Sequence, residues 1–216
     1  MSFQNAFLGS LVADAISMPV HWYYNRKSLD QDYGDFQGYC KPKAFHPDSI
    51  LWRSSYIPHG PKADILGTQT KYWGQRGIHY HQFLEAGDNT LNLQLAAELY
   101  RETIINGDFD PETWLNRYAQ VMLTPGWHQD TYAEEYHRAF FTNYSKGKSL
   151  HSCGISDYHI GGLSLVPALL AGMEAVVQIQ PSEQIDKVLN LVRLTHDHEN
   201  TLRAATDLTR ILQKLI

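Results

Sequence analysis

The sequence predicts an all-α fold in one domain that spans residues 1–216. Several stretches repeat apolar residues at helical spacing between recognisable caps, and no stretch alternates apolar with polar residues as a strand does. The hydrophobic content of 43% over 216 residues suffices for one core. A long aromatic-rich stretch interrupts the helical pattern, so we expect a compact multi-helix bundle with one irregular segment.

The first predicted helix covers Phe3–Met18, where apolar side chains recur at helical spacing. Pro19 ends it, because proline lacks the N–H that a continuing helix needs. Asp14 lies within this mostly apolar helix and is expected to be partly buried. An ionised carboxylate in that position requires hydrogen-bond donors or a cation.

Residues 21–85 show no helical periodicity, and repeated prolines and glycines argue against a long helix there. Loops of this length within a domain are usually functional or disordered. The abundance of Trp, Tyr and His in the segment argues against disorder. We therefore predict an ordered, aromatic-rich covering over one end of the helical body.

The rest of the chain reads as a series of helices. Gly107 is typical of a helix C-terminus, Asp110 and Ser182 of N-caps, and Asp197 or Asn200 is the expected cap of the last helix. The predicted helices cover residues 91–106, 111–124, 130–144, 160–177, 183–194 and a final stretch beginning near residue 199.

Composition excludes several classes of protein. The formal net charge of −5 and the isoelectric point of about 6.1 argue against a nucleic-acid-binding surface. No apolar run approaches the ~18 residues of a membrane span, and the start of the chain does not resemble a signal peptide. Cys40 and Cys153 allow at most one bridge. A soluble, cytoplasmic protein without a nucleic-acid or membrane partner is expected.

Gly87–Thr90, at the start of a predicted helix, is a candidate metal site. The oxygens of Asp88, Asn89 and Thr90 are hard ligands that suit Mg²⁺ or Mn²⁺. The alternative is structural, because Asp88 is also a typical helix cap. The four residues alone favour the cap.

Two later stretches also carry polar side chains that suit a site. Residues 195–199, between two helices, place His196 in a turn where it could bind a ligand, hold a metal or serve as a polar linker. Residues 152–162 end in Gly161 and Gly162, which suit either close helix packing or the approach of backbone N–H groups to a phosphate. Cys153 in that stretch lacks an assignable activating partner, so a structural thiol is expected.

Taken together, these segments resemble the ADP-ribosylglycohydrolase family. Gly9–Pro19 resembles the opening G-x-x-x-G-D-A-x-G-x-P helix of that family, and Gly87–Thr90 falls where the family has its T-D-D-T metal motif. Gly161–Pro167 resembles the helix after the ADP-ribose loop, and Thr195-His196 matches a later T-H turn. His21–Tyr23 resembles more narrowly the branch that includes J1-crystallin-like members.

The resemblance implies an all-α body with a cleft in which paired Mg²⁺ or Mn²⁺ ions organise the ribose of an ADP-ribosyl group and a water. It implies hydrolysis of an N- or O-glycosidic bond, with an ADP-ribosylated protein or a small ADP-ribosyl ligand as partner. Asp88 is the implied catalytic residue and, with Asn89 and Thr90, a metal ligand. The implied substrate-binding residues are Asp14, His21, Asp157, Gly161 and His196.

The chain departs from the family pattern at several positions. Gly87 and Asn89 replace a Thr and an Asp of the metal motif, and His21 stands where family enzymes often carry an acidic residue. The second metal motif, near D-x-D-T, would lie beyond Ile216, so the domain is expected to be C-terminally incomplete. We therefore expect a degenerate metal site.

Two alternative functions follow from these departures. The first is a non-catalytic, crystallin-like or ligand-binding helical protein with a decayed cleft. The second is a metal phosphohydrolase that uses His151, His196, Asp197 and Asp207. The leading hypothesis requires residues 14, 88, 157 and 196 to meet at the rim of one hollow.

Overall fold

A computed structural model describes residues 2–177 and 179–216, and within these ranges it is 58% helical and contains no strand. The all-α prediction is therefore confirmed. None of the helices in these ranges is both long and apolar enough to cross a lipid bilayer. The α-helices are α1 (Phe3–Ser17), α2 (Arg26–Tyr33), α3 (Leu91–Asn106), α4 (Pro111–Met122), α5 (Glu135–Ser145), α6 (Val166–Val176), α7 (Pro181–Arg193) and α8 (Glu199–Leu215).

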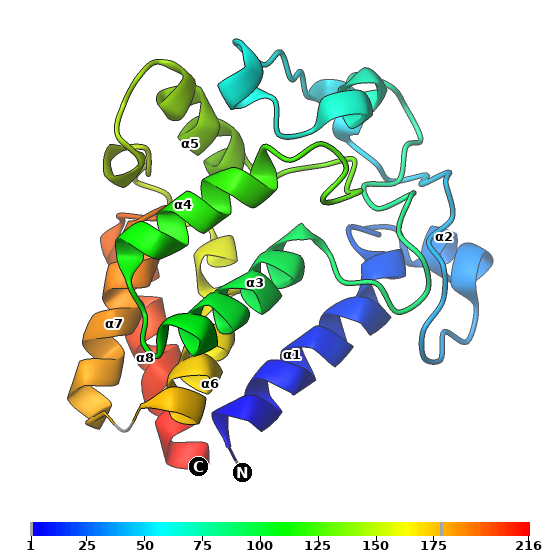
Figure 1. Ribbon diagram of the computed structural model, residues 1–216. Helices are drawn as coiled ribbons and strands as arrows, with labels where there is room; N and C mark the ends of the chain where they lie inside the picture. The colour runs from blue at the N-terminus through cyan, green and yellow to red at the C-terminus, as the bar shows by residue number, and fades with distance from the viewer. Residues whose placement is uncertain (1, 178) are drawn as a thin grey trace.

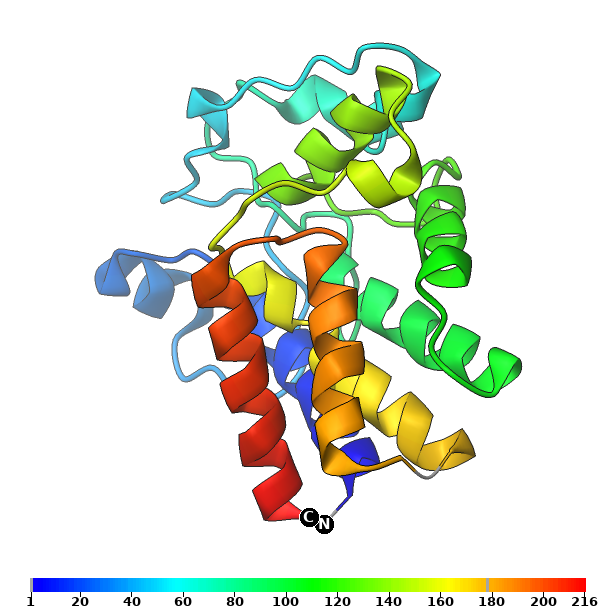
Figure 2. The ribbon, with the colours of Figure 1, turned by 90° about the vertical axis from the view of Figure 1, so that its left-hand side faces the viewer.

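The helical body is built around α6, which packs against both α1 and α3 (Figure 1). Most residues of α6 are buried, because the helix is apolar on nearly all sides. Gly172 of α6 faces Thr103 of α3 so closely that a Cβ would lie 2.9 Å from the Thr103 Cβ. Helices α7 and α8 lie side by side on the outside of this body (Figure 2).

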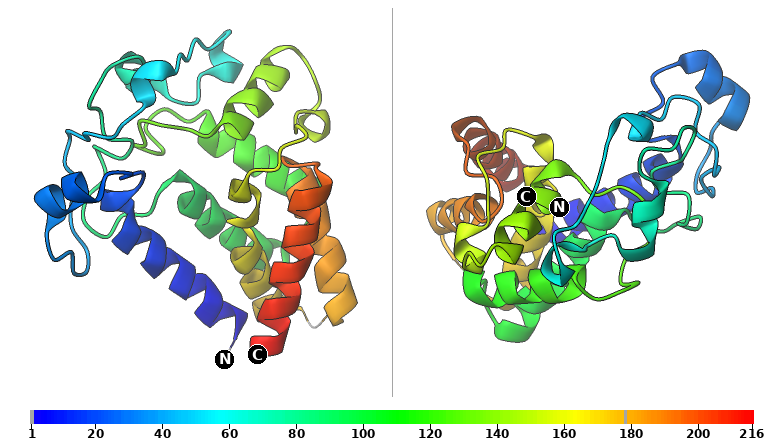
Figure 3. Two further views of the ribbon diagram at one scale, coloured as in Figure 1. Left: turned by 180° about the vertical axis from the view of Figure 1, so that it is seen from behind. Right: turned by 90° about the horizontal axis from the view of Figure 1, so that it is seen from above.

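Residues 21–85 form an ordered covering, as the sequence predicts. Together with α5 they lie over the end of the body that is remote from the start of α1 and the end of α8 (Figures 1 and 3). Here Trp73 donates its indole N–H to the Thr131 carbonyl at 2.8 Å. His46 and His79 hydrogen-bond through Nε2 to the carbonyls of His21 (2.9 Å) and Pro19 (3.0 Å). These side chains provide the anchoring that regular secondary structure provides elsewhere.

The covering contains one helix that the sequence did not predict, α2. It buries none of its residues, so no apolar periodicity marks it. Its ends are nevertheless specified locally, because the Asn25 side chain accepts a hydrogen bond from Lys27 N and Gly34 follows the helix with a φ of +56°.

Several predicted helix boundaries and caps were wrong. Helix α5 begins at Glu135 rather than at Asp130, whose carboxylate accepts a hydrogen bond from the distant Leu91 N–H. The predicted helix over residues 160–177 divides into a 3₁₀ turn, Ile160–Leu163, and α6. The caps also differ: Gln180, not Ser182, precedes α7, and His198, not Asp197 or Asn200, caps α8 by accepting from Asn200 N.

Candidate functional site

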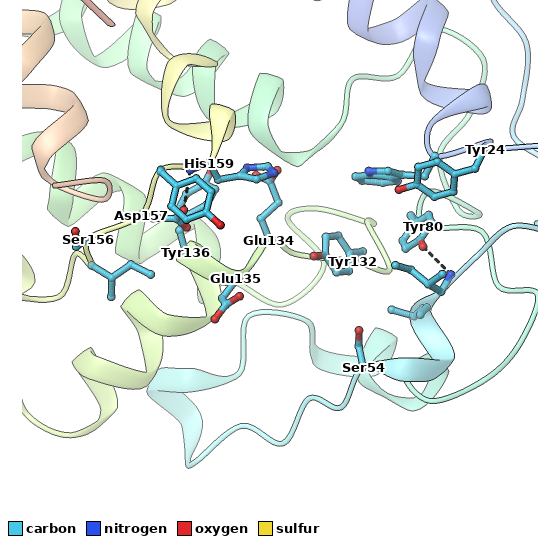
Figure 4. Close-up of a pocket in the computed structure, with 15 residues that line it drawn as sticks. Tyr24, Ser54, Tyr80, Tyr132, Glu134, Glu135, Tyr136, Ser156, Asp157 and His159 are labelled. Atoms are coloured by element: carbon cyan, nitrogen blue, oxygen red, sulfur yellow. Dashed lines mark hydrogen bonds and ion pairs between the residues drawn. The ribbon is translucent and has the colours of Figure 1, made fainter. Parts of the chain in front are cut away.

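Two adjoining cavities lie where the aromatic covering meets the helical body, and Figure 4 shows the larger one. Their volumes are about 440 Å³ and about 160 Å³. Trp22, Tyr132 and Glu134 line both, so the cavities meet at these side chains. The larger cavity is also lined by Tyr24, Tyr80, Glu135, Tyr136, Asp157, Tyr158 and His159, and the smaller by Asp14, His21, His81, Thr90, Asn92 and Asp130, among others.

Glu134 stands at the boundary between the two cavities, directly before α5. Its side chain is 18% exposed, and Oε2 accepts a hydrogen bond from Asn92 Nδ2 at 2.7 Å. Burial raises the pKa of the Glu134 carboxyl, and the nearby charge of Asp157 acts in the same direction. His159 Nδ1 lies 3.4 Å from Oε1. A carboxyl with a raised pKa in a cavity is suited to proton transfer.

The orientation of Asn92 is determined by its other contacts. Asn92 Oδ1 accepts from Tyr136 OH at 2.8 Å and faces His137 Nε2 at 3.0 Å. His137 Nδ1 in turn lies 2.6 Å from Tyr118 OH. These contacts are consistent with one direction of donation along the chain. Tyr118 O–H donates to His137 Nδ1, and His137 Nε2–H donates to Asn92 Oδ1. The Asn92 amide N–H is then the group that donates to Glu134.

Gly161 provides room for the Glu134 carboxylate. A Cβ on Gly161 would lie 2.8 Å from Glu134 Oε2 and 3.1 Å from Tyr136 Cε1. Gly161 is buried, and its N–H donates to His159 Nδ1 at 3.2 Å. The structure therefore places this predicted residue beside the cavities, where its lack of a side chain matters.

Trp22 forms the aromatic wall that the two cavities share. Within the described ranges it is the one non-glycine residue with a positive φ, +59°. Its indole packs against Tyr80, His81 and Tyr132 at ring-centroid distances of 4.4, 5.5 and 5.7 Å. A bulky residue in this backbone conformation is strained, and such strain concentrates at functional sites.

Asp14, Asn89 and Thr90 meet beside the smaller cavity. Asp14 Oδ2 accepts from Thr90 N at 2.7 Å and from Asn89 Nδ2 at 3.0 Å, and Oδ1 accepts from Thr90 Oγ1 at 2.8 Å. Burial raises the pKa of Asp14 and these hydrogen bonds oppose the rise. The prediction that Asp14 is partly buried and needs donors is confirmed.

Asp88 lies apart from this group. It is exposed on a turn, where its Oδ2 accepts from Glu85 N at 2.8 Å, and it lines a different, open cavity with Glu85 and Arg101. It does not cap α3 either, because Thr90 occupies the N-cap position. Residues 14, 88, 157 and 196 therefore do not meet at one hollow, and Asp88 is not brought into the site.

His21 belongs to a buried chain of polar side chains at the smaller cavity. His21 Nε2 lies 3.1 Å from Ser17 Oγ, and His21 Nδ1 lies 3.0 Å from His81 Nε2. His81 Nδ1 pairs with the Asp130 carboxylate, which also accepts from Leu91 N at 2.7 Å. Burial lowers the pKa of His21 to about 4, so its ring is neutral at pH 7.

Asp157 is at the surface of the larger cavity, whereas His196 lies deeper in the protein. Asp157 lines the larger cavity and accepts from His159 N at 2.8 Å. His196 lies behind the cavity wall with its ring 4.2 Å from that of Tyr136, and burial lowers its pKa to about 4. Its Nε2 is buried without a hydrogen-bond partner. His196 therefore supports Tyr136 and does not line either cavity.

The residues proposed for a phosphohydrolase are not brought together. His151 is exposed in a 3₁₀ turn, and Asp207 lies 3.9 Å from Arg210 on the surface of α8. Cys153 is buried with its thiol 3.2 Å from the Ser149 carbonyl, and burial raises its pKa, as expected of a structural thiol. In the described part of the chain, no three His, Cys, Asp or Glu residues form a group that could hold a metal ion.

The residues around Asp14 do not fit a pair of divalent cations. Both Asp14 oxygens already accept hydrogen bonds, and the Asn89 amide group donates to Asp14 and to the Leu11 carbonyl. Gly87 has a φ of +94°, a conformation that the Thr of the family motif would adopt only with strain. Mg²⁺ and Mn²⁺ need several available oxygen ligands, which this arrangement does not supply.

Sequence reasoning missed Glu134, Asn92 and Asp130 as site residues, and it did not pair His81 with Asp130. The available sequence signal for Glu134 was the Glu134-Glu135 pair before a helix. That signal is ambiguous, because acidic residues at this position also stabilise the start of a helix. The other three side chains become recognisable only through contacts made across the fold.

Comparison with known proteins assigns the chain to a family. Residues 2–216 match the family described as ADP-ribosylglycohydrolase. Neither a curated protein nor a solved structure matches. Because the match spans nearly all 216 residues and agrees with the helical fold, the chain belongs to the ADP-ribosylglycohydrolase family.

Proposed function

We propose that the chain hydrolyses the N- or O-glycosidic bond of an ADP-ribosyl group, carried by a protein or a small molecule, with Glu134 as the acid–base group. Family membership supports a hydrolase of the glycohydrolase type. The observation that carries the residue assignment is the position of Glu134 between two cavities, with a raised pKa and a hydrogen bond from Asn92.

The chemistry of the bond suits this carboxyl. Cleavage at the anomeric carbon develops positive charge on the sugar, which a nearby carboxylate stabilises. A protonated Glu134 can donate to the leaving group, and the ionised form can accept a proton from the attacking water. Asp157 and His21 line the cavities on either side of Glu134 and are proposed to bind substrate.

Asp88 has no step in this proposal, because its carboxylate is engaged on an exposed turn. No step passes through a metal ion either, since the donor set around Asp14 does not fit one. The proposed reaction therefore depends on Glu134 and on the groups that orient it.

The test is hydrolysis of an ADP-ribosylated protein by the purified chain, compared with Glu134→Gln. Loss of a positioned acid–base group reduces turnover about 10²- to 10⁴-fold. Glu183→Gln, an exposed change at the start of α7, is the matched control and should retain activity. Equal activity of the wild type and Glu134→Gln would overturn the assignment.

Calorimetric titration with ADP-ribose separates binding from catalysis. A chain that binds ADP-ribose but does not release it from any ADP-ribosylated substrate would be the non-catalytic ligand-binding protein instead. A chain that neither binds nor hydrolyses would overturn the proposed substrate.

A further inference from the structure

The larger cavity is lined by acidic side chains without a basic one among the described residues. The described residues that line it include three carboxylates, Glu134, Glu135 and Asp157, and no Lys or Arg. Arg138 of α5 does not line the cavity: its guanidinium lies over the Trp73 ring at 5.1 Å and its Nε donates to the Ala133 carbonyl. Its positive charge acts on the cavity-lining Tyr132, where it opposes the burial that raises the pKa of Tyr132.

Aromatic rings make up much of the remaining wall. Figure 4 shows Tyr24, Tyr80 and Tyr132 on one side of the cavity and Tyr136 on the other, with Glu134 between them. Trp22 and Tyr158 complete a set of six aromatic side chains. Tyr24 and Tyr158 are 69% and 78% exposed, so rings without packing partners on most of their surface are available to a ligand.

We propose that the larger cavity binds an organic ammonium cation. Aromatic faces attract a cation through their quadrupole, and carboxylates at the same site add direct attraction. A cavity of about 440 Å³ is in the range that holds a small organic molecule. This inference goes beyond the proposed function, because it concerns the binding of a cation and does not depend on hydrolysis of an ADP-ribosyl bond.

Two other classes of ligand fit less well. A diphosphate would bring negative charge next to Glu134, Glu135 and Asp157, and no Lys or Arg is among the described residues that line the cavity. The diphosphate of an ADP-ribosyl substrate would therefore lie outside this cavity. A purely apolar ligand would displace water from Glu134, Glu135 and Asp157 without offering their carboxylates a charge or a hydrogen bond in exchange.

Charge can be tested separately from shape with choline and its uncharged carbon isostere, 3,3-dimethylbutan-1-ol. Calorimetry or tryptophan fluorescence at constant ionic strength should show choline binding at least about tenfold more tightly than the alcohol. Equal affinity for the two would overturn the proposal.

Substitutions of residues that line the cavity test whether choline binds there. Asp157→Asn keeps an acceptor for His159 N but removes a charge, and should weaken choline binding about threefold or more. Glu183→Gln, remote on α7, controls for the change in net charge. Tyr24→Leu should weaken binding similarly, whereas Tyr39→Leu, at a comparably exposed position outside the cavity, should not.

The outcomes separate this inference from the proposed function. Choline binding is measured without an ADP-ribosyl substrate, so a chain inactive toward such substrates can still bind it. If choline binds but Asp157→Asn and Tyr24→Leu both bind it as well as the wild type, the cation lies elsewhere and the proposal fails.

Discussion

Asn92 Nδ2 donates a hydrogen bond of 2.7 Å to Glu134 Oε2, and so joins the first turn of α3 to the residue that precedes α5. The amide cannot flip without losing its contacts with Tyr136 and His137. Glu134 is thereby held at the boundary of the two cavities by a group that favours its ionised form.

Asn92→Asp should raise the pKa of Glu134, because it replaces a donor with a second carboxylate. If Glu134 acts in its ionised form, the acid limb of the pH–activity profile shifts to higher pH, and activity near neutral pH falls. The shift is measured from hydrolysis rates between pH 5 and 9.

Asn116→Asp, the same change on the exposed face of α4, is the control and should leave the profile in place. A loss of activity in Asn92→Asp without any shift of the profile would indicate that Asn92 is only structural.

Gly161→Ala should displace the Glu134 carboxylate, since the new Cβ would lie 2.8 Å from Oε2. The closest atom belongs to the end of a flexible side chain, and the next, Tyr136 Cε1, would lie 3.1 Å away, so the fold should persist while activity falls about tenfold or more. Gly9→Ala, in open space on α1, should retain activity and add about 0.5–1 kcal/mol of stability. Hydrolysis rates and thermal melts of both variants test this, and unchanged activity in Gly161→Ala would contradict it.

Asp14→Asn should destabilise the protein by about 2–3 kcal/mol. The amide cannot accept all three hydrogen bonds from Asn89 and Thr90, and its own N–H₂ would face their donors. Asp88→Asn changes an exposed carboxylate that accepts one backbone bond, and should alter stability by less than about 0.5 kcal/mol. Urea unfolding compares the two, and equal effects would be inconsistent with the burial of Asp14.

Stability should fall as the pH is lowered from about 6.5 to 4. Burial lowers the pKa of His79 to about 3, so this ring stays neutral in the folded state while the unfolded chain takes up a proton below about 6.5. The unfolded state then binds more protons, and His79 alone accounts for about 3 kcal/mol by pH 4.

Urea unfolding at pH 4, 5, 6 and 7 measures this slope. His79→Gln should flatten it, whereas His59→Gln, at an exposed position in the covering, should not. A free energy of unfolding that does not change between pH 7 and 4 would contradict the neutral, buried state of His79.

Addition of Mg²⁺ or Mn²⁺ at millimolar concentration should not raise the melting temperature above that in NaCl of equal ionic strength. Asp14 is already engaged by three donors, so an ion would have to displace hydrogen bonds to bind. A concentration-dependent increase in melting temperature specific to these ions would contradict the conclusion that the residues around Asp14 do not fit a divalent cation.

The sequence by itself determined the helical elements, because helix formation depends on residues close together in the chain. Apolar spacing located the helices of the body, and Asp110, which accepts from Thr113 N, marked the start of α4. Gly107, in the left-handed conformation, marked the end of α3. The spacing of motifs in order along the chain likewise sufficed for the family. The same local reasoning missed α2, whose exposed residues bear no apolar pattern.

Only the tertiary structure decided which polar residues share a site. Asp14 meets Thr90 across 76 positions of sequence and Asn92 meets Glu134 across 42, whereas Asp88, two residues before Thr90, turns to solvent. At the start of a helix, consecutive side chains point in different directions. Residues that are adjacent in the chain can therefore lie in different surroundings, while residues far apart in the chain form a pair. Which of them lie together depends on how α1, α3 and the covering pack, and no local pattern encodes that packing.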